Sequence, residues 1–135
     1  MRLVVDTNVV AYHLLGTPRF AAEAAEFLEG AEEILAPALW EAELANVIWM
    51  AVRANVLRAQ EAPSRLALAA RLGVQSVPIR TLWHGALVRS LQSGVAVYDT
   101  LFVELADRER LTLATFDQKL IQAFPALAKR PRKSG

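Results

Sequence analysis

The stretch that most constrains the fold is residues 3–8, Leu-Val-Val-Asp-Thr-Asn, close to the N-terminus. Its three apolar residues, two of them β-branched, predict a buried strand. Asp6 follows directly, and Thr7 and Asn8 are residue types that favour the start of a helix. Because open α/β sheets bind ligands at the carboxyl ends of their strands, we expect Asp6 to lie at a crevice. An anion buried there requires something positive to meet it.

The rest of the chain alternates between short apolar strands and helices. Further strands are expected at residues 33–36, 74–79 and 111–115, and helices at residues 8–15, 19–29, 39–54, 58–72, 81–93, 97–110 and 118–124. This alternation predicts an α/β fold with a short, mostly parallel sheet of about four or five strands, flanked by helices. We expect a single domain over residues 1–125 and a basic, flexible tail over residues 126–135.

Composition bounds the class of protein. The chain has 135 residues, enough for one core, and is 54% hydrophobic with a net charge of +1. The apolar excess favours either a partner surface or tightly packed Ala/Leu-rich helices. The absence of cysteine excludes disulfides and thiolate metal sites. Asp6 interrupts the first apolar run too early for a signal peptide, and no apolar stretch approaches the roughly 20 residues that span a bilayer, so we expect a cytoplasmic protein.

Four acidic residues stand where an element begins or ends, or at the border of a core-facing helix stripe. Asp6 and Asp117 follow strands at the same edge of the predicted sheet, whereas Glu43 and Asp99 lie on helices. Each has an ordinary structural explanation as a helix cap or a solvated residue. Together in one pocket they would repel one another strongly unless a hard cation joined them. All-oxygen ligands point to Mg²⁺ or Mn²⁺ rather than Zn²⁺.

Polar side chains flank these acids and can orient ligands or metal-bound waters. They belong to Thr7, Asn8, Asn46 and Thr115. Since Thr7 and Asn8 begin a helix, backbone N–H groups there can also hold a phosphate.

The four acids stand in short motifs of recognisable order and spacing. The motifs are Val5-Asp6-Thr7-Asn8, Pro37 with Glu43-Leu44-Ala45-Asn46, Tyr98-Asp99-Thr100-Leu101 with Leu105-Ala106, and Thr115-Phe116-Asp117. From Leu3 to about Phe124 the chain resembles the PIN domain, above all the VapC-type toxins of bacterial and archaeal toxin–antitoxin pairs. Thr100 stands where the family more often has Ala, and Phe116 where a small or polar residue is frequent. Neither departure removes a carboxylate.

The resemblance implies a PIN-like α/β/α sandwich and a Mg²⁺- or Mn²⁺-dependent endoribonuclease. Asp6, Asp99 and Asp117 would hold metal directly, and Glu43 would bind metal or water or serve as the base. In-line attack of water on the RNA phosphate would leave 5′-phosphate and 3′-hydroxyl ends. The family also implies a small antitoxin that covers the site, and a homodimer.

Cations should surround an acidic pocket that receives RNA. The candidates are Arg53, Arg58, Arg80, Arg89, Lys129, Arg130, Arg132 and Lys133. Trp40, Trp49 and Trp83 suit either base stacking or a packed core or interface. Two alternatives stay open: a catalytically silent PIN-like module that binds RNA or protein, and a PIN ribonuclease without an antitoxin.

Overall fold

The computed structural model describes residues 1–131, which form a five-stranded sheet in the order β3-β2-β1-β4-β5. All neighbouring strands are parallel. The strands are β1 (Arg2–Val5), β2 (Glu33–Pro37), β3 (Gln75–Val77), β4 (Leu113–Ala114) and β5 (Ala128–Lys129). The helices are α1 (Thr7–Leu15), α2 (Ala21–Glu29), α3 (Leu39–Arg53), α4 (Ala62–Ala70), α5 (Trp83–Ser93), α6 (Val97–Glu109) and α7 (Gln118–Ala123), with short 3₁₀ turns η1 (Ala59–Glu61) and η2 (Ile79–Thr81).

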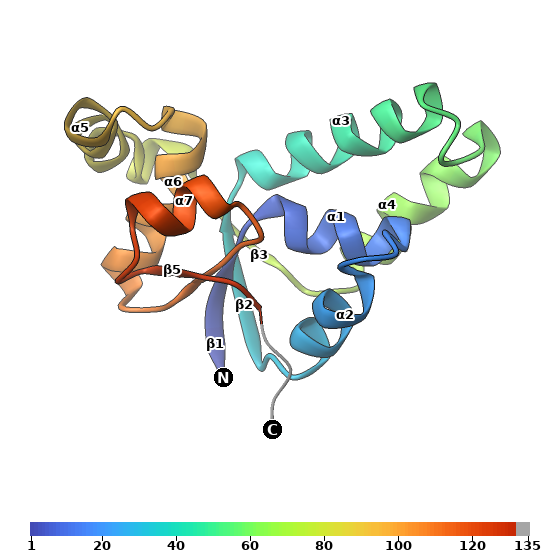
Figure 1. Cartoon of the computed structure of the whole chain (residues 1–135), viewed down its shortest axis with the longest axis horizontal. Coiled ribbons are helices and arrows are strands. Elements are labelled where there is room, and N and C mark those ends of the chain that lie inside the picture. Colours follow the sequence, from blue (N-terminus) through green and yellow to red (C-terminus); the bar gives the residue numbers. More distant parts are fainter. Residues whose placement is uncertain (132–135) are drawn as a thin grey trace.

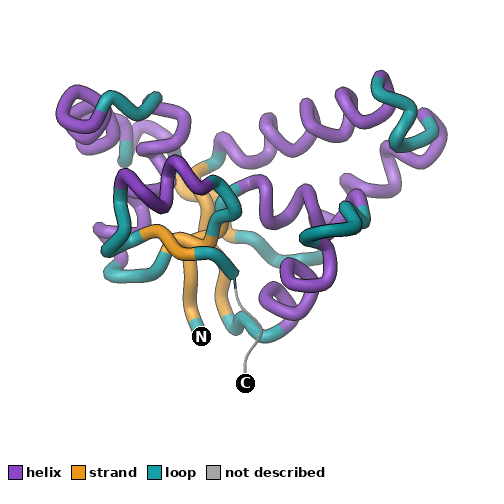
Figure 2. The backbone as a smooth tube through the Cα atoms, viewed as in Figure 1, coloured by secondary structure: helices purple, strands orange, loops and turns teal. Residues whose placement is uncertain are grey.

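Helices cover the sheet from two sides. In Figure 1, α1 to α4 lie on the right of the strands and α5 to α7 on the left. Figure 2 shows the strands as a compact central group between the two sets of helices. The predicted α/β sandwich with a parallel sheet is therefore confirmed. Across residues 1–131, no helix is at once long and apolar enough to cross a bilayer.

The central strand β1 is buried because both its edges and both its faces are covered. It pairs with β2 on one side and β4 on the other, and Val4 and Val5 have no exposed surface. Phe102 and Leu105 of α6 are almost fully buried within the same core. Burial on two faces explains why β1 is a continuous apolar run and does not alternate with polar residues.

The parallel arrangement fixes where the acidic residues lie. Asp6 follows β1, and Asp117 follows β4 after Thr115 and Phe116. Helix α3, which carries Glu43, begins after β2. Since parallel strands end at the same edge of a sheet, three of the four acids are delivered to the carboxyl edge by topology alone.

Pro63 marks the start of a helix that is shorter than expected. The helix expected over residues 58–72 is divided into η1 and α4, and Pro63 lies in the first turn of α4. Proline is tolerated there because the N–H group that it lacks has no partner within a helix. Arg58 itself lies before η1, where its guanidinium pairs with Glu61.

The fold continues beyond Pro125, where we expected it to end. Ala128 and Lys129 form β5 on the outer side of β4, and the backbone of Leu127 accepts a hydrogen bond from the Leu113 N–H at 2.8 Å. The expectation of a flexible tail is therefore wrong for residues 128–129, which belong to the sheet. It arose because a two-residue strand has no apolar periodicity that a sequence could show. Arg132 and Lys133 lie outside the described residues.

Candidate active site

Asp6 occupies the position before α1, yet its side chain does not cap the helix. Its backbone is extended, and its side chain makes no capping hydrogen bond to α1. Instead Oδ2 accepts hydrogen bonds from the Thr115 hydroxyl at 2.7 Å and from the Asn8 amide at 3.3 Å. The side chain thus turns toward β4, and the ordinary capping role of such an aspartate does not explain its presence.

Thr115 joins the residues that follow β1 to those that follow β4. It is fully buried, and its hydroxyl oxygen accepts the backbone N–H of Asp117 at 3.0 Å while donating to Asp6. The Asn8 amide lies 3.4 Å from the same hydroxyl, and Asn8 Oδ1 accepts the N–H of Phe116 at 3.2 Å. Residues 115–117 are therefore held in one conformation around the Asp6 carboxylate.

Asp117 has a structural role and leaves one oxygen available. Its Oδ1 caps α7 by accepting the N–H groups of Lys119 at 2.9 Å and Leu120 at 3.3 Å. Within residues 1–131, Oδ2 accepts no hydrogen bond from the protein. Capping fixes the carboxylate in orientation, and the second oxygen can serve as a ligand.

Glu43 reaches the same region from α3. It is half-buried, and its Oε1 accepts a hydrogen bond from the Thr7 hydroxyl at 2.8 Å. Burial raises the pKa of Glu43 above its usual 4.5; the Thr7 hydroxyl acts in the opposite direction, and the negative charge of Asp99 adds to the increase. Thr7 is buried and engaged in this contact, so its side chain orients Glu43.

Asp99 is the acid with the fewest contacts and the most acidic neighbours. It lies in the first turn of α6, three residues after the N-cap position Ala96. Burial raises its pKa, and the charge of Asp117 raises it further. Its own charge raises the pKa values of Asp6 and Glu43. Asp99 is thus close enough to interact electrostatically with the other three carboxylates.

The pKa of Asp6 shows the cost of gathering these charges. The pKa of Asp6 is raised from 3.8 to about 7, chiefly by burial; the Thr115 hydroxyl lowers it, and the charges of Asp99 and Glu43 contribute to the increase. In residues 1–131, no Lys or Arg forms an ion pair with any of the four acids. The group is therefore a concentration of negative charge that the described protein does not neutralise.

Negatively charged oxygen donors fit a hard divalent cation in their chemistry. However, no three acidic or histidine side chains of residues 1–131 surround one point as a ready-made metal site. Two surface cavities, of about 500 and about 900 Å³, are lined by other residues. The candidate site is consequently defined by charge and hydrogen bonding. Side-chain movement would have to complete a coordination sphere.

The remaining predicted residues are distributed more widely. Asn46 is exposed, and its amide contacts the sulfur of Met50 at 3.6 Å, so it does not reach an acid. Trp40 is buried and donates from Nε1 to Ser76 Oγ at 2.8 Å. Trp49 and Trp83 are more than half exposed. Trp40 therefore belongs to the core, and the other two remain available for contacts.

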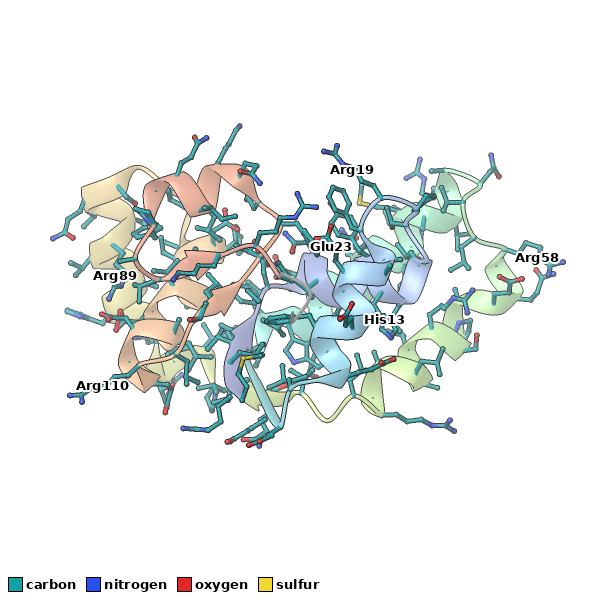
Figure 3. All side chains as sticks on the ribbon, turned by 60° about the horizontal axis from the view of Figure 1, so that its bottom comes forward. His13, Arg19, Glu23, Arg58, Arg89 and Arg110 are labelled. Carbon is teal, nitrogen blue, oxygen red and sulfur yellow. The ribbon has the colours of Figure 1, made fainter. Side chains whose placement is uncertain are left out.

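The arginines expected to contact RNA do not form one surface. Arg58 pairs with Glu61, and Arg89 pairs with Glu104 and Asp107 between α5 and α6. Figure 3 shows Arg58 and Arg89 at opposite ends of the molecule. Arg53 lies 4.9 Å from the ring of Trp49, and Arg80 lies 5.4 Å from the ring of Trp83. Neither of these two has an ion-pair partner in the described part of the chain.

Arg130 takes part in a contact that the sequence did not suggest. Its guanidinium forms two hydrogen bonds with Glu23 of α2, at 3.0 and 3.1 Å. It also lies over the rings of Phe20 and Phe116, at 5.3 and 5.4 Å. Residues 23 and 130 are far apart in the chain, and no periodicity links them, so only the fold reveals the pair.

Comparison with known sequences decides the family. The sequence model of the family described as PIN domain matches residues 3–125. The chain belongs to the PIN domain family. Among curated proteins it is similar to Ribonuclease VapC3 of Pyrobaculum aerophilum, with 34% identity over 132 residues that cover 94% of this chain and 98% of the relative. The resemblance to PIN domains of the VapC type is confirmed.

Solved structures show that other chains share this fold. A toxin–antitoxin complex from Klebsiella pneumoniae aligns with a TM-score of 0.66 and 20% identity, over 98% of this PIN domain chain and 99% of the other. VapBC2 from Rickettsia felis, bound to a DNA fragment from its promoter, has a TM-score of 0.66 and 17% identity over 96% and 98%. FitAcB from Neisseria gonorrhoeae has a TM-score of 0.60 and 24% identity over 97% and 98%.

Proposed function

We propose that this PIN domain is a divalent-metal-dependent endoribonuclease and the toxin of a VapBC-type toxin–antitoxin pair. The observation that carries the proposal is the group of Asp6, Glu43, Asp99 and Asp117. Within it, neighbouring charges raise the pKa values of Asp6, Glu43 and Asp99, and no Lys or Arg of the described chain pairs with the group to offset them. A structural role gives no reason to assemble such repulsion, whereas ion binding does. The relative named as a ribonuclease and the structural neighbours named as toxin–antitoxin complexes support this reading.

Asp6, Asp99 and Asp117 are the proposed ligands of Mg²⁺ or Mn²⁺. When bound, such an ion lowers the pKa of a water molecule and polarises the scissile phosphate. Thr115 fixes Asp6 and the backbone of Asp117, whereas Glu43 accepts a single hydrogen bond, from the Thr7 hydroxyl. The two acids that follow strands are therefore the more firmly oriented. In the proposed hydrolysis the water oxygen bonds to phosphorus, the bond from phosphorus to the 3′-oxygen breaks, and that oxygen gains a proton.

The decisive test is RNA cleavage by purified protein with Mg²⁺ or Mn²⁺, with EDTA, and with the variant Asp6→Asn. We expect the wild type and the control variant to cleave RNA when the metal is present, with 5′-phosphate and 3′-hydroxyl ends on the products, and no cleavage with EDTA or by Asp6→Asn. The control variant is Glu109→Gln, because Glu109 is an exposed acid on the same helix as Asp99. Equal cleavage by wild type and Asp6→Asn would indicate a contaminant. Binding of RNA without cleavage would indicate a catalytically silent module.

Glu43 has two roles open to it, and one variant separates them. As a ligand, Glu43 contributes to ion affinity; as a base, it accepts the proton of the attacking water. Calorimetric titration of Glu43→Gln with Mn²⁺ distinguishes the two. If Glu43→Gln keeps its affinity for Mn²⁺ but loses cleavage, Glu43 is the base. If it loses both, Glu43 is a ligand of the ion.

The proposed partners are RNA, a small antitoxin and a second copy of the chain. The exposed apolar residues Trp83, Leu87 and Leu91 recur every four positions along α5 and so lie on one helix face, as expected of an assembly surface. We expect light scattering to give the mass of a dimer for the wild type and of a monomer for Leu87→Glu. Co-expression with the product of a neighbouring short gene tests the antitoxin. If no such gene exists, the protein is a solitary ribonuclease.

A further inference from the structure

The C-terminal strand contacts the candidate site through its backbone. The N–H of Thr115 donates to the carbonyl oxygen of Lys129 at 3.0 Å, and Ala114 pairs with Lys129 in the sheet. Strand β4 is only two residues long, so β5 supplies much of its outer hydrogen bonding. The residue whose hydroxyl holds Asp6 is therefore itself held by the strand that precedes Arg130.

The side chain of Arg130 contacts the segment of residues 115–117 as well. Its guanidinium covers the ring of Phe116, the residue between Thr115 and Asp117, and is fixed by two hydrogen bonds to Glu23. Phe116 also packs against Tyr12 and Phe20, with ring centroids 5.4 and 4.9 Å away. Arg130 thereby ties the turn after β4 to helix α2.

Two independent contacts thus converge on residues 115–117, one through the backbone of Lys129 and one through the side chain of Arg130. The described contacts of Arg130 are with Glu23, Phe20 and Phe116, and none is with the four acids. Any effect of Arg130 on the ion site must therefore pass through these neighbours. The ion pair of Arg130 with Glu23 is bidentate and only about one-third exposed, so the guanidinium is held in a fixed orientation. Arg130 holds Phe116, the residue between Thr115 and Asp117, in place.

We propose that Arg130, fixed by Glu23, is a positioning residue that holds the Thr115–Asp117 turn, and with it Asp6, in the geometry that binds the divalent ion. This rests on the proposed function of the site. It assigns a role to the segment after Pro125, which the family match at residues 3–125 does not cover.

The test compares Arg130→Met and Glu23→Gln with Arg2→Met. The control removes a similar ion pair, Arg2 with Glu33, from the amino end of the same sheet. Three quantities are measured on each folded variant: Mn²⁺ affinity by calorimetry, kcat and KM for RNA, and amide hydrogen exchange. We expect Arg130→Met and Glu23→Gln to weaken Mn²⁺ binding and lower kcat by about tenfold with little change in KM.

Amide exchange reports the position of the turn without requiring activity. The N–H groups of Thr115 and Phe116 should exchange faster by about tenfold in both variants. The N–H of Val4, bonded to Thr112 at 3.0 Å, should keep its protection. Arg2→Met should leave all three readouts at the wild-type values. Because Arg130 and Glu23 act as one pair, the double variant should lose no more than either single variant.

A lower melting temperature with unchanged Mn²⁺ affinity and unchanged exchange at Thr115 and Phe116 would overturn the proposal, because Arg130 would then only stabilise the fold. If Arg130→Met does not fold, Arg130→Lys and Glu23→Gln decide in its place. Lysine retains the charge without the planar two-bond contact, and should give an intermediate loss. If the wild type neither binds Mn²⁺ nor cleaves RNA, the proposed function fails while the exchange measurement still tests Arg130.

Discussion

The two halves of the candidate site are built differently. The strand half, Asp6 with Thr115 and Asp117, follows β1 and β4 and is joined by hydrogen bonds at 2.7 and 3.0 Å. The helix half, Glu43 on α3 and Asp99 on α6, has a single hydrogen bond from Thr7 to Glu43, and none to the Asp99 carboxylate within residues 1–131. The strand half is preorganised, whereas the helix half can still move.

This difference agrees with the absence of three acids in ligating positions among the described residues. Asp99 interacts electrostatically with the other three acids, and repulsion favours a separation that only a cation can close. We infer that the strand half receives the ion and that Glu43 and Asp99 adjust to it. The predictions below test this inference.

The largest effect is expected from removing one charge in each half. Asp6→Asn and Asp99→Asn should each lower the cleavage rate by about 10³-fold or more, because both halves contribute to the same transition state. Their effects on the metal-free protein should differ. Asp6→Asn removes a buried charge and should raise the free energy of unfolding in EDTA, whereas Asp99→Asn, at a half-exposed position, should raise it less. A stability gain that is larger for Asp99→Asn would contradict the comparison.

The second prediction concerns pH. Asp6 has a pKa of about 7 in the folded chain and 3.8 as the reference for the unfolded one. Between these values the folded chain binds more protons, so the free energy of unfolding falls as pH rises. The difference in pKa corresponds to a loss of about 4 kcal/mol in the free energy of unfolding once Asp6 is fully ionised.

Urea unfolding in EDTA measures this dependence between about pH 5 and about pH 8. Asp6→Asn should remove most of the fall, and Mn²⁺ should offset it in the wild type because the ion favours the ionised form. The prediction is contradicted if the free energy of unfolding of the wild type rises over this range, or if Asp6→Asn shows the same pH dependence as the wild type. Ionisation of Asp6 would then not destabilise the folded chain.

The strand half was also the half that the sequence predicts more fully. Asp6 and Asp117 follow apolar stretches, and the parallel α/β pattern alone brings them to one edge of the sheet. Thr115 was expected to flank the acids, and the structure shows it between them. Local pattern suffices here because short loops leave the chain few alternative directions.

The helix half and the C-terminal strand show where such reasoning ends. A helical period of 3.6 placed Glu43 near a core-facing stripe, but the same reasoning placed Asn46 beside it, and Asn46 is exposed. The side chains of Thr7 and Asn8 were expected to orient ligands, and they bond to Glu43, Asp6 and residue 116. The phosphate contact expected of their backbone N–H groups stays a prediction. β5 depends on pairing with a distant strand, and two residues carry no pattern of their own.

The third prediction separates the hydroxyl of Thr115 from its bulk. Thr115→Val keeps the volume but leaves the Asp117 N–H without its partner and Asp6 without its closest donor. We expect a loss of stability of about 1–3 kcal/mol and a fall in cleavage of about 10- to 100-fold. Thr115→Ser, which retains the hydroxyl, should recover most of the activity. If Thr115→Val and Thr115→Ser have the same kcat and the same free energy of unfolding in urea, the hydroxyl does not organise the strand half.

The smallest effect is expected from the corresponding change in the helix half. Thr7→Val removes the one hydrogen bond that orients Glu43, at 2.8 Å, but Glu43 is half-exposed and water can replace the donor. We expect a change in stability of about 1 kcal/mol or less and a fall in kcat of about three- to tenfold. The ratio of the two kcat losses, Thr115→Val over Thr7→Val, measures how much more the strand half depends on fixed hydrogen bonds. A ratio of one would mean that both halves are equally preorganised, and that ion binding does not depend on movement of Glu43 and Asp99.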